Sequence, residues 1–188
     1  MKKKIITISG RPGSGKSSTA DLVAKELGYE RFSSGDFMRK MALDRGITLL
    51  QLSTMAERDR SIDAEIDAEI KKLRSREGTV IDSRLAFHWI PESFKVFLDL
   101  PMEISEQRIR QDLRENKFRG ASDRMQEEEI YQKTVARLES EYKRYKELYG
   151  IENYADKKNF DLIIDTQKNG LEQVVAIILQ KYPEWLAD

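Results

Sequence analysis

The sequence contains no cysteine and only one histidine, His88. The lack of cysteine excludes disulfide bonds and thiolate metal sites, and it is compatible with a reducing compartment. Acid–base or metal chemistry based on histidine would depend on His88 alone, and we expect this residue to be structural. No apolar run approaches the ~20 residues of a membrane-spanning helix, and the run after the basic residues 2–4 is too short for a signal peptide. These absences predict a cytoplasmic protein with no membrane partner.

The sequence also lacks a net charge, because 33 Lys and Arg residues balance 33 Asp and Glu residues. This balance argues against broad attraction to nucleic acid, although it leaves room for a local basic cleft. We therefore expect no nucleic-acid partner. Hydrophobic residues make up 39% of the 188 residues, which is enough for the core of one α/β domain.

Apolar runs and helical patterns alternate along the chain. The apolar runs predict strands at residues 5–9, 29–34, 79–81, 94–100 and 160–165. Helices are predicted at residues 17–27, 36–45, 47–55, 102–116, 123–148 and 171–182, and in a stripe formed by Ile62, Ile66, Ile70 and Leu73. This alternation favours a parallel sheet with helices on both faces. Residues 36–77 show helical patterns only. We expect one domain spanning 1–188, in which residues 36–77 form an inserted substrate-binding subdomain.

The segment "GRPGSGKS" matches the pattern G-x-x-x-x-G-K-[ST] through Gly10, Gly15, Lys16 and Ser17. Glycines let the backbone turn so that several N–H groups face a phosphate, and the following helix points its positive end at it. Lys16 would reach the β- and γ-phosphates and Ser17 would ligate Mg²⁺. The alternative is a glycine-rich turn with an incidental lysine. A regulatory GTPase is disfavoured, because we find no D-x-x-G switch and no N-K-x-D guanine motif.

Two further segments carry polar residues just after predicted strands. In "FSSGDFMRK", Ser34, Gly35 and Arg39 form a candidate phosphate pocket, or else Ser34 caps a helix and Arg39 is solvated. In "TVIDSRLAF", Asp82 would hold Mg²⁺ through water and Arg84 would clamp a phosphate, because ligands bind beyond the carboxyl ends of parallel strands. The alternative for this second pair is a turn with a surface ion pair.

Arginines are frequent in the second half of the chain. Arg137 and Arg144 are seven residues apart, about two helical turns, so they share a face of the predicted long helix. Phosphoryl transfer needs such charges, because its transition state is dispersed over oxygens. Many surface arginines merely form i,i+4 pairs, such as Arg137 with Glu141, and we expect Arg114 and Arg119 to lie at the surface.

The order of the segments "GRPGSGKSS", "SSGDFMR", "VIDSRLA", "FKVFLDLP" and "EYKRYKELYGIENYADKKNFDLIIDT" resembles the archaeal-type cytidylate kinases, a branch of the nucleoside monophosphate kinases. The resemblance implies an α/β fold of the P-loop NTPase class, with three α/β/α layers and a five-stranded parallel sheet. It also implies a helical monophosphate-binding insert, at about 36–77, and a short lid, at about 108–137. Family members have an arginine near position 105, where this chain has Ser105.

The resemblance implies transfer of the ATP γ-phosphoryl group to CMP, and also to dCMP, by a monomer that needs Mg²⁺. The implied ATP-binding residues are Gly10, Arg11, Pro12, Gly13, Ser14, Gly15, Lys16, Ser17, Ser18 and Arg108. The implied monophosphate-binding residues are Ser34, Gly35, Arg39, Asp63 and Arg84. The implied catalytic residues are Lys16, Arg84, Arg137 and Arg144, and the implied metal-binding residues are Ser17 and Asp82.

Two other functions fit the same P-loop: a small-molecule kinase with another acceptor, such as AMP, UMP or a shikimate-like compound, and an ATPase without a nucleotide acceptor. A shikimate- or gluconate-type kinase would phosphorylate a hydroxyl group, but shikimate kinases carry a D-x-D after the second strand, where this chain reads "SSGD". A P-loop ATPase of assembly or regulation would hydrolyse ATP without any nucleotide acceptor. The sequence leaves both open as alternatives to a monophosphate kinase.

Overall fold

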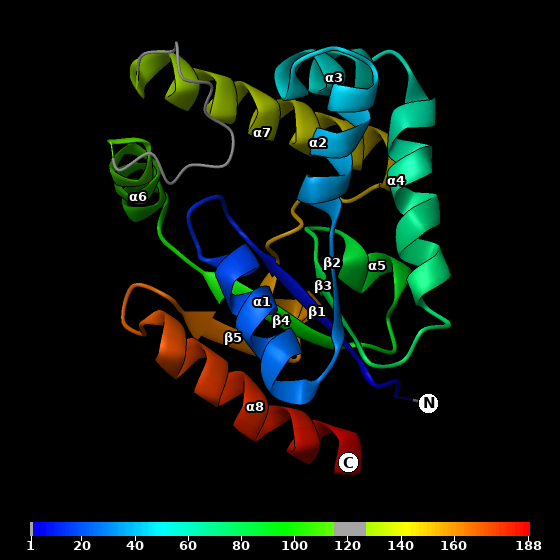
Figure 1. Cartoon of the computed structure of the whole chain (residues 1–188), viewed down its shortest axis with the longest axis vertical. Coiled ribbons are helices and arrows are strands. Elements are labelled where there is room, and N and C mark those ends of the chain that lie inside the picture. The colour runs from blue at the N-terminus through cyan, green and yellow to red at the C-terminus, as the bar shows by residue number, and fades with distance from the viewer. Residues whose placement is uncertain (1, 115–126) are drawn as a thin grey trace.

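The computed structural model describes residues 2–114 and 127–188. Its centre is a parallel sheet of five strands in the order β2-β3-β1-β4-β5 (Figure 1). The strands are β1 Ile5–Gly10, β2 Glu30–Ser33, β3 Thr79–Asp82, β4 Phe94–Asp99 and β5 Leu162–Asp165. Every residue of β1 is buried, as expected for a central parallel strand that reads as one apolar run. The predicted five-stranded parallel sheet is confirmed.

Helices cover both faces of the sheet (Figure 1). Their bounds are α1 Lys16–Leu27, α2 Ser34–Asp44, α3 Leu49–Ala56, α4 Arg60–Leu73, α5 Ala86–Trp89, α6 Met102–Arg114, α7 Glu127–Tyr149 and α8 Leu171–Ala187. Side chains alternate along β1, so that Ile6 and Ile8 pack with α1 and α8, whereas Ile5 packs with α2 to α5. The two cores lie on opposite faces, and the molecule therefore has three layers. None of the described helices is long and apolar enough to cross a membrane.

Several elements differ from the sequence predictions. The short helix α5 and a 3-10 turn at Lys157–Asn159 were not predicted, because each is too short to show a period. Helix α3 begins at Leu49 rather than residue 47, since Thr48 and Gln51 form a capping box at its start. The predicted start of the long helix at residue 123 lies outside the described residues.

The topology brings the candidate site residues to one edge of the sheet. All strands run in the same direction, so their carboxyl ends meet there. Ser33 at the end of β2 is in register with Asp82 at the end of β3, which in turn is in register with Ile8 of β1. The loop after β1 therefore lies next to the first residues of α2 and to the segment after β3.

Candidate active site

The segment between β1 and α1 forms a cradle of backbone amides. Gly10 has φ 156°, and a Cβ atom there would lie 2.7 Å from both the Leu98 carbonyl oxygen and the Ser14 hydroxyl. Gly15, with φ 83°, is the N-cap of α1 and supplies no side-chain cap, so the first N–H groups of the helix are open to an anion. The Ser14 hydroxyl is buried and has no hydrogen-bond partner. These features fit the phosphates of a bound nucleotide.

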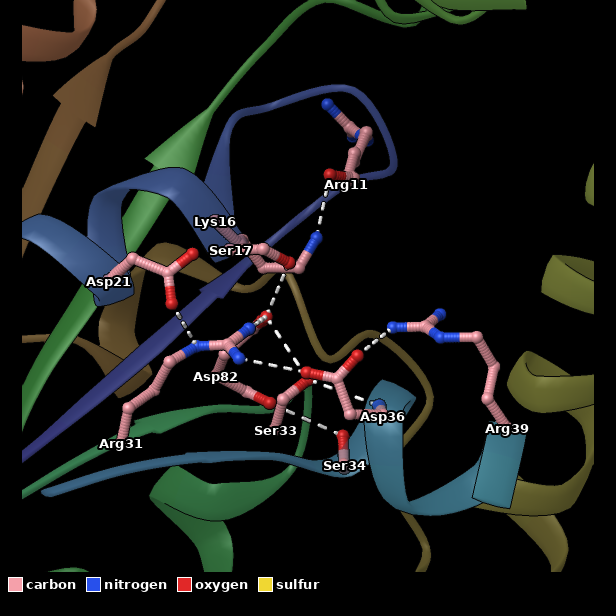
Figure 2. Close-up of polar contacts among 10 residues, drawn as sticks. All are labelled: Arg11, Lys16, Ser17, Asp21, Arg31, Ser33, Ser34, Asp36, Arg39 and Asp82. Atoms are coloured by element: carbon pink, nitrogen blue, oxygen red, sulfur yellow. Dashed lines mark hydrogen bonds and ion pairs between the residues drawn. The ribbon is translucent and has the colours of Figure 1, made fainter. Parts of the chain in front are cut away.

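Lys16 lies in this cradle and donates from Nζ to the Arg11 carbonyl oxygen at 2.9 Å (Figure 2). Burial is the main cause that lowers the pKa of Lys16, and with the added effect of the nearby Arg84 guanidinium the pKa is about 8. The carboxylates of Asp82 and Glu141 act in the opposite direction. Without a bound anion, burial and the neighbouring arginines therefore destabilise the charged form of Lys16.

Ser17 and Asp82 are in direct contact, as Figure 2 shows. The Ser17 hydroxyl donates to Asp82 Oδ2 at 2.7 Å, and the Asp82 side chain is buried. The described residues contain no group of three or more histidines, aspartates or glutamates placed to hold a metal ion. Mg²⁺ in P-loop proteins needs no such group, because the hydroxyl, a strand-end carboxylate and the nucleotide phosphates share it. The Ser17–Asp82 pair fits that arrangement.

Arg31 of β2 is a residue that the sequence analysis missed. Its guanidinium contacts Asp21 of α1 at 2.9 Å, Asp36 of α2 at 2.8 Å and Asp82 at 3.5 Å (Figure 2). It therefore joins the helix that follows the cradle to the start of α2. The alternation of side chains along a strand, which puts Arg31 on the same side as Ser33, was the available signal.

The first turn of α2 lies beside Asp82. The Ser33 hydroxyl accepts a hydrogen bond from the backbone N–H of Asp36 at 3.2 Å, so Ser33, not Ser34, caps the helix. The Ser34 hydroxyl instead donates to the Asp82 carbonyl oxygen at 3.4 Å. Arg39 is ion-paired with Asp36 and partly exposed. The alternative in which Ser34 caps the helix is thus wrong.

A cavity opens between α2, α4, the segment after β3 and α7. Its lining includes the predicted monophosphate-binding residues Ser34, Gly35, Arg39, Asp63 and Arg84. A second, open cleft lies over the cradle and includes Lys16, Ser17 and Asp82. Both are lined by Ser34, Gly35, Arg39, Ser83, Arg84 and Arg137. The two cavities therefore meet where three arginines converge.

Glu141 of α7 is the buried anion at this junction. Its carboxylate lies 2.7 Å from Arg84 Nη1 and 3.6 Å from Arg137 Nε, and its side chain is 3% exposed. Burial lowers the pKa of Arg137, and the neighbouring Arg84 and Arg39 lower it further, against the effect of Glu141. The i,i+4 pair of Arg137 and Glu141 is therefore present. It lies in the interior rather than at the surface, and Arg84 is its third member.

Arg144 is placed differently from Arg137. It is 3% exposed and binds Asp63 from Nε at 2.7 Å and from Nη2 at 3.4 Å. Its Nη1 donates to the Ser140 hydroxyl at 2.6 Å and to the Ser53 carbonyl oxygen at 3.3 Å. Burial raises the pKa of Asp63, whereas Arg144 acts to lower it. Arg144 lines the cavity but also links α7 to α3 and α4.

Helix α6 packs directly on the cradle. Ser105 donates to the Pro12 carbonyl oxygen at 2.7 Å, and a Cβ atom on Gly13 would lie 3.2 Å from the Ser105 carbonyl oxygen. Arg108 donates to the Thr166 carbonyl oxygen at 2.6 Å and to that of Gly13 at 3.4 Å. At Ser105, the backbone of α6 therefore lies very close to the backbone of the cradle.

The predicted lid is only partly described. Arg110 joins α6 to α7 by pairing with Glu128 at 2.8 Å and by lying 4.3 Å from the centre of the Tyr131 ring. Arg119 and the rest of residues 115–126 lie outside the described residues, as does the side chain of Arg114.

The fold and the site define a P-loop kinase. A family model described as an AAA domain matches residues 9–131. Cytidylate kinases from Halobacterium salinarum and Methanocella arvoryzae are each 37% identical to this chain, over 98% and 96% of its length and 92% and 97% of theirs. The cytidylate kinase from Ignicoccus hospitalis is 34% identical over 93% of this chain and 96% of its own. The chain belongs to the cytidylate kinase family, within the P-loop proteins that the AAA-domain model describes.

Solved structures share the fold at lower identity. A shikimate kinase from Acinetobacter baumannii in complex with shikimate has a TM-score of 0.58 at 19% identity, covering 96% of this chain and 93% of its own. A gluconokinase from Sinorhizobium meliloti has a TM-score of 0.57 at 20% identity, covering 97% of this chain and 94% of its own. These similarities confirm the three-layer P-loop fold.

Replacing Arg144 with Leu removes the buried cation beside Asp63. We expect a loss of about 3–5 kcal/mol in the free energy of unfolding, because an unpaired carboxylate stays in the interior. Urea denaturation measures this loss. The double variant Asp63→Leu/Arg144→Leu should recover most of it, since replacing both partners with apolar residues is often neutral. The neighbouring Lys143→Leu, at an exposed position, should change the stability by less than about 0.5 kcal/mol. Equal losses in the single and double variants would contradict a paired clamp.

The lowered pKa of Lys16 predicts proton uptake when ATP binds. Below about pH 8, Lys16 is charged with or without ATP; above it, the free protein has a neutral lysine that the phosphates recharge. The Kd for ATP should therefore rise by up to about tenfold per pH unit between roughly pH 8 and 10. Calorimetry at pH 9 in two buffers of different ionisation enthalpy measures the uptake. Lys16→Arg, which keeps its charge, should abolish it. No uptake by the wild type would contradict the prediction.

Proposed function

We propose that the protein transfers the γ-phosphoryl group of ATP to CMP, and also to dCMP, giving ADP and the nucleoside diphosphate. The observation that supports this most is the junction of two cavities at Arg39, Arg84 and Arg137. A P-loop ATPase needs the cleft over the cradle but not a second cavity that opens on the same arginines. The choice of CMP as the acceptor rests on the relatives, since several of them are cytidylate kinases.

On this proposal the cleft over the cradle receives the donor. The backbone N–H groups of Gly10 to Ser18, apart from Pro12, which has none, and the ammonium of Lys16 bind the triphosphate, while Arg108, which spans Gly13 and Thr166, borders the nucleoside side. Ser17 and Asp82 hold Mg²⁺ between them, and the ion, when bound, neutralises charge on the phosphate oxygens. The predicted lid, at about 108–137, excludes water from this cleft.

The cavity between α2 and α7 receives the acceptor. Ser34, Gly35 and Arg39 bind its phosphate, and Arg84 and Arg137 bind the transferring group where the cavities meet. No general base is needed, because an oxygen of the acceptor phosphate is already nucleophilic, and catalysis consists of positioning and charge stabilisation. Arg144 contributes by holding α7, which carries Arg137 and Glu141, against α3 and α4.

The wider setting follows from the same reasoning. We propose a cytoplasmic monomer whose partners are small nucleotides and neither nucleic acid nor membrane. The balanced charge of the chain and its lack of cysteine support this setting.

A coupled assay of ATP and Mg²⁺ with each common monophosphate tests the function. We expect kcat/KM for CMP to exceed that for UMP, AMP and GMP, with dCMP next to CMP, because the cytidylate kinase relatives cover nearly the whole chain. ADP release without acceptor is the background control. ATP hydrolysis at one rate whatever monophosphate is present would overturn the proposal in favour of an ATPase.

Arg39→Ala should weaken the acceptor side selectively. We expect the KM for CMP to rise about 10- to 100-fold and kcat to fall, because a charge-assisted contact to the phosphate is lost. The Kd for ATP, measured by calorimetry, should change by less than about threefold. Arg45→Ala is the matched control, since Arg45 caps the far end of α2 and pairs with Glu65 at an exposed position. Unchanged CMP kinetics in Arg39→Ala would remove Arg39 from the site.

A further inference from the structure

The acceptor cavity has two chemically different ends. The end shared with the ATP cleft contains Arg39, Arg84 and Arg137 and suits a phosphate. The unshared part of the lining contains four residues of α4 at helical spacing: Asp63, Ile66, Asp67 and Ile70. A monophosphate whose phosphate lies at the shared end places its base in the unshared part, which α4 lines together with Met38, Leu49, Leu85 and residues of α7.

The two carboxylates of α4 have different partners. Asp63 is neutralised by the Arg144 guanidinium, which binds both of its oxygens. Asp67 is held by two neutral donors: Trp89 Nε1 at 2.9 Å to Oδ1, and the Tyr149 hydroxyl at 2.5 Å to Oδ2. Asp67 is 7% exposed, and it lines the cavity. Its orientation is fixed by α5 and α7, and burial raises the pKa of Asp67 whereas these two donors and the Lys71 ammonium, which lies over the Trp89 ring, act to lower it.

The chemistry of a carboxylate limits what Asp67 accepts as a ligand. Each of its oxygens carries two lone pairs, so one contact to Trp89 or Tyr149 leaves room for another donor. Such a group binds an amino group and repels a carbonyl oxygen. The 4-position of the pyrimidine ring is an amino group in cytosine and a carbonyl in uracil, and Ile66 and Ile70 give the cavity wall on either side of Asp67 an apolar character.

We propose that Asp67 is the residue that selects the base, by accepting a hydrogen bond from the exocyclic amino group of cytosine and disfavouring the carbonyl oxygen of uracil. This inference rests on the proposed function, because it concerns the acceptor of the same reaction. Asp67 is thereby a specificity-determining residue, fixed in place by Trp89 and Tyr149.

The test changes the residue and the substrate separately and together, so that the coupling between them can be measured. Wild type and Asp67→Asn are assayed with CMP, with UMP and with the analogue of CMP that lacks the exocyclic amino group. In the wild type, loss of the amino group should lower kcat/KM about 10- to 100-fold, as expected for one hydrogen bond to a charged group. In Asp67→Asn the penalty should shrink to a few-fold. The CMP-to-UMP ratio should fall by about 100-fold, because the amide can donate to the carbonyl of uracil.

Two variants serve as controls. Glu65→Gln makes the same change of charge on an exposed side chain of α4 that does not line the cavity, and it should leave the CMP-to-UMP ratio unchanged. Tyr149→Phe removes a donor to Asp67 but keeps the carboxylate, so the enzyme should still prefer CMP. A merely structural Asp67 would slow both substrates alike and leave the ratio in place.

The outcomes separate the inference from the proposed function. No turnover of CMP by the wild type overturns both. Turnover of CMP, with an unaltered CMP-to-UMP ratio in folded Asp67→Asn, overturns only the role of Asp67. If Asp67→Asn does not fold, the wild type decides alone: an analogue without the amino group that reacts within about twofold of CMP overturns the inference.

Discussion

The buried carboxylate of Glu141 is the constraint on which the site depends. Arg84 and Arg137 converge at the junction of the two cavities, with Lys16 nearby in the cleft over the cradle, and like charges at close range in the interior repel one another. Glu141 contacts both arginines from α7, so the guanidinium groups stay charged and positioned without a bound phosphate. The pKa of Lys16 is lowered mainly by burial and further by Arg84 and Arg137, so a bound anion would stabilise the charged form of this lysine.

The same principle recurs around the rest of the site. Arg39 is paired with Asp36, Arg31 with Asp21, Asp36 and Asp82, and Arg144 with Asp63. Each pair joins side chains of different strands or helices, except the local pair within α2. The chain has equal numbers of acidic and basic residues, and around the phosphate cradle these residues also pair locally. Such a site is held in place before substrate binds, and little reorganisation is left for the reaction itself.

The sequence predicted the parts of the site that follow from local rules. The cradle, Asp82 and the start of α2 all come directly after strands, and parallel strands bring such segments to one edge. Arg31 and Asp67 were not identified, and Glu141 was named only as a surface partner of Arg137, because their other contacts are with residues far away in the chain. Arg144 and Asp63 were predicted individually, yet only the structure pairs them. Likewise, the contact between Ser105 and Pro12 depends on how closely α6 approaches the cradle.

On the proposed function, selectivity and catalysis are separated along the acceptor cavity. Every nucleoside monophosphate carries the same phosphate, so the arginines at the junction bind all of them by the same contacts and cannot distinguish bases. A phosphate that binds there must compete with existing partners, because Arg39 already pairs with Asp36. The net gain in affinity is therefore smaller than the contact between Arg39 and the phosphate alone suggests. On the proposed function, discrimination therefore arises in the part of the cavity that is not shared with the ATP cleft, to which α4 contributes four residues. A hydrogen-bonding carboxylate is suited to this task, because a buried polar group left without its partner penalises the wrong base more strongly than an apolar wall does.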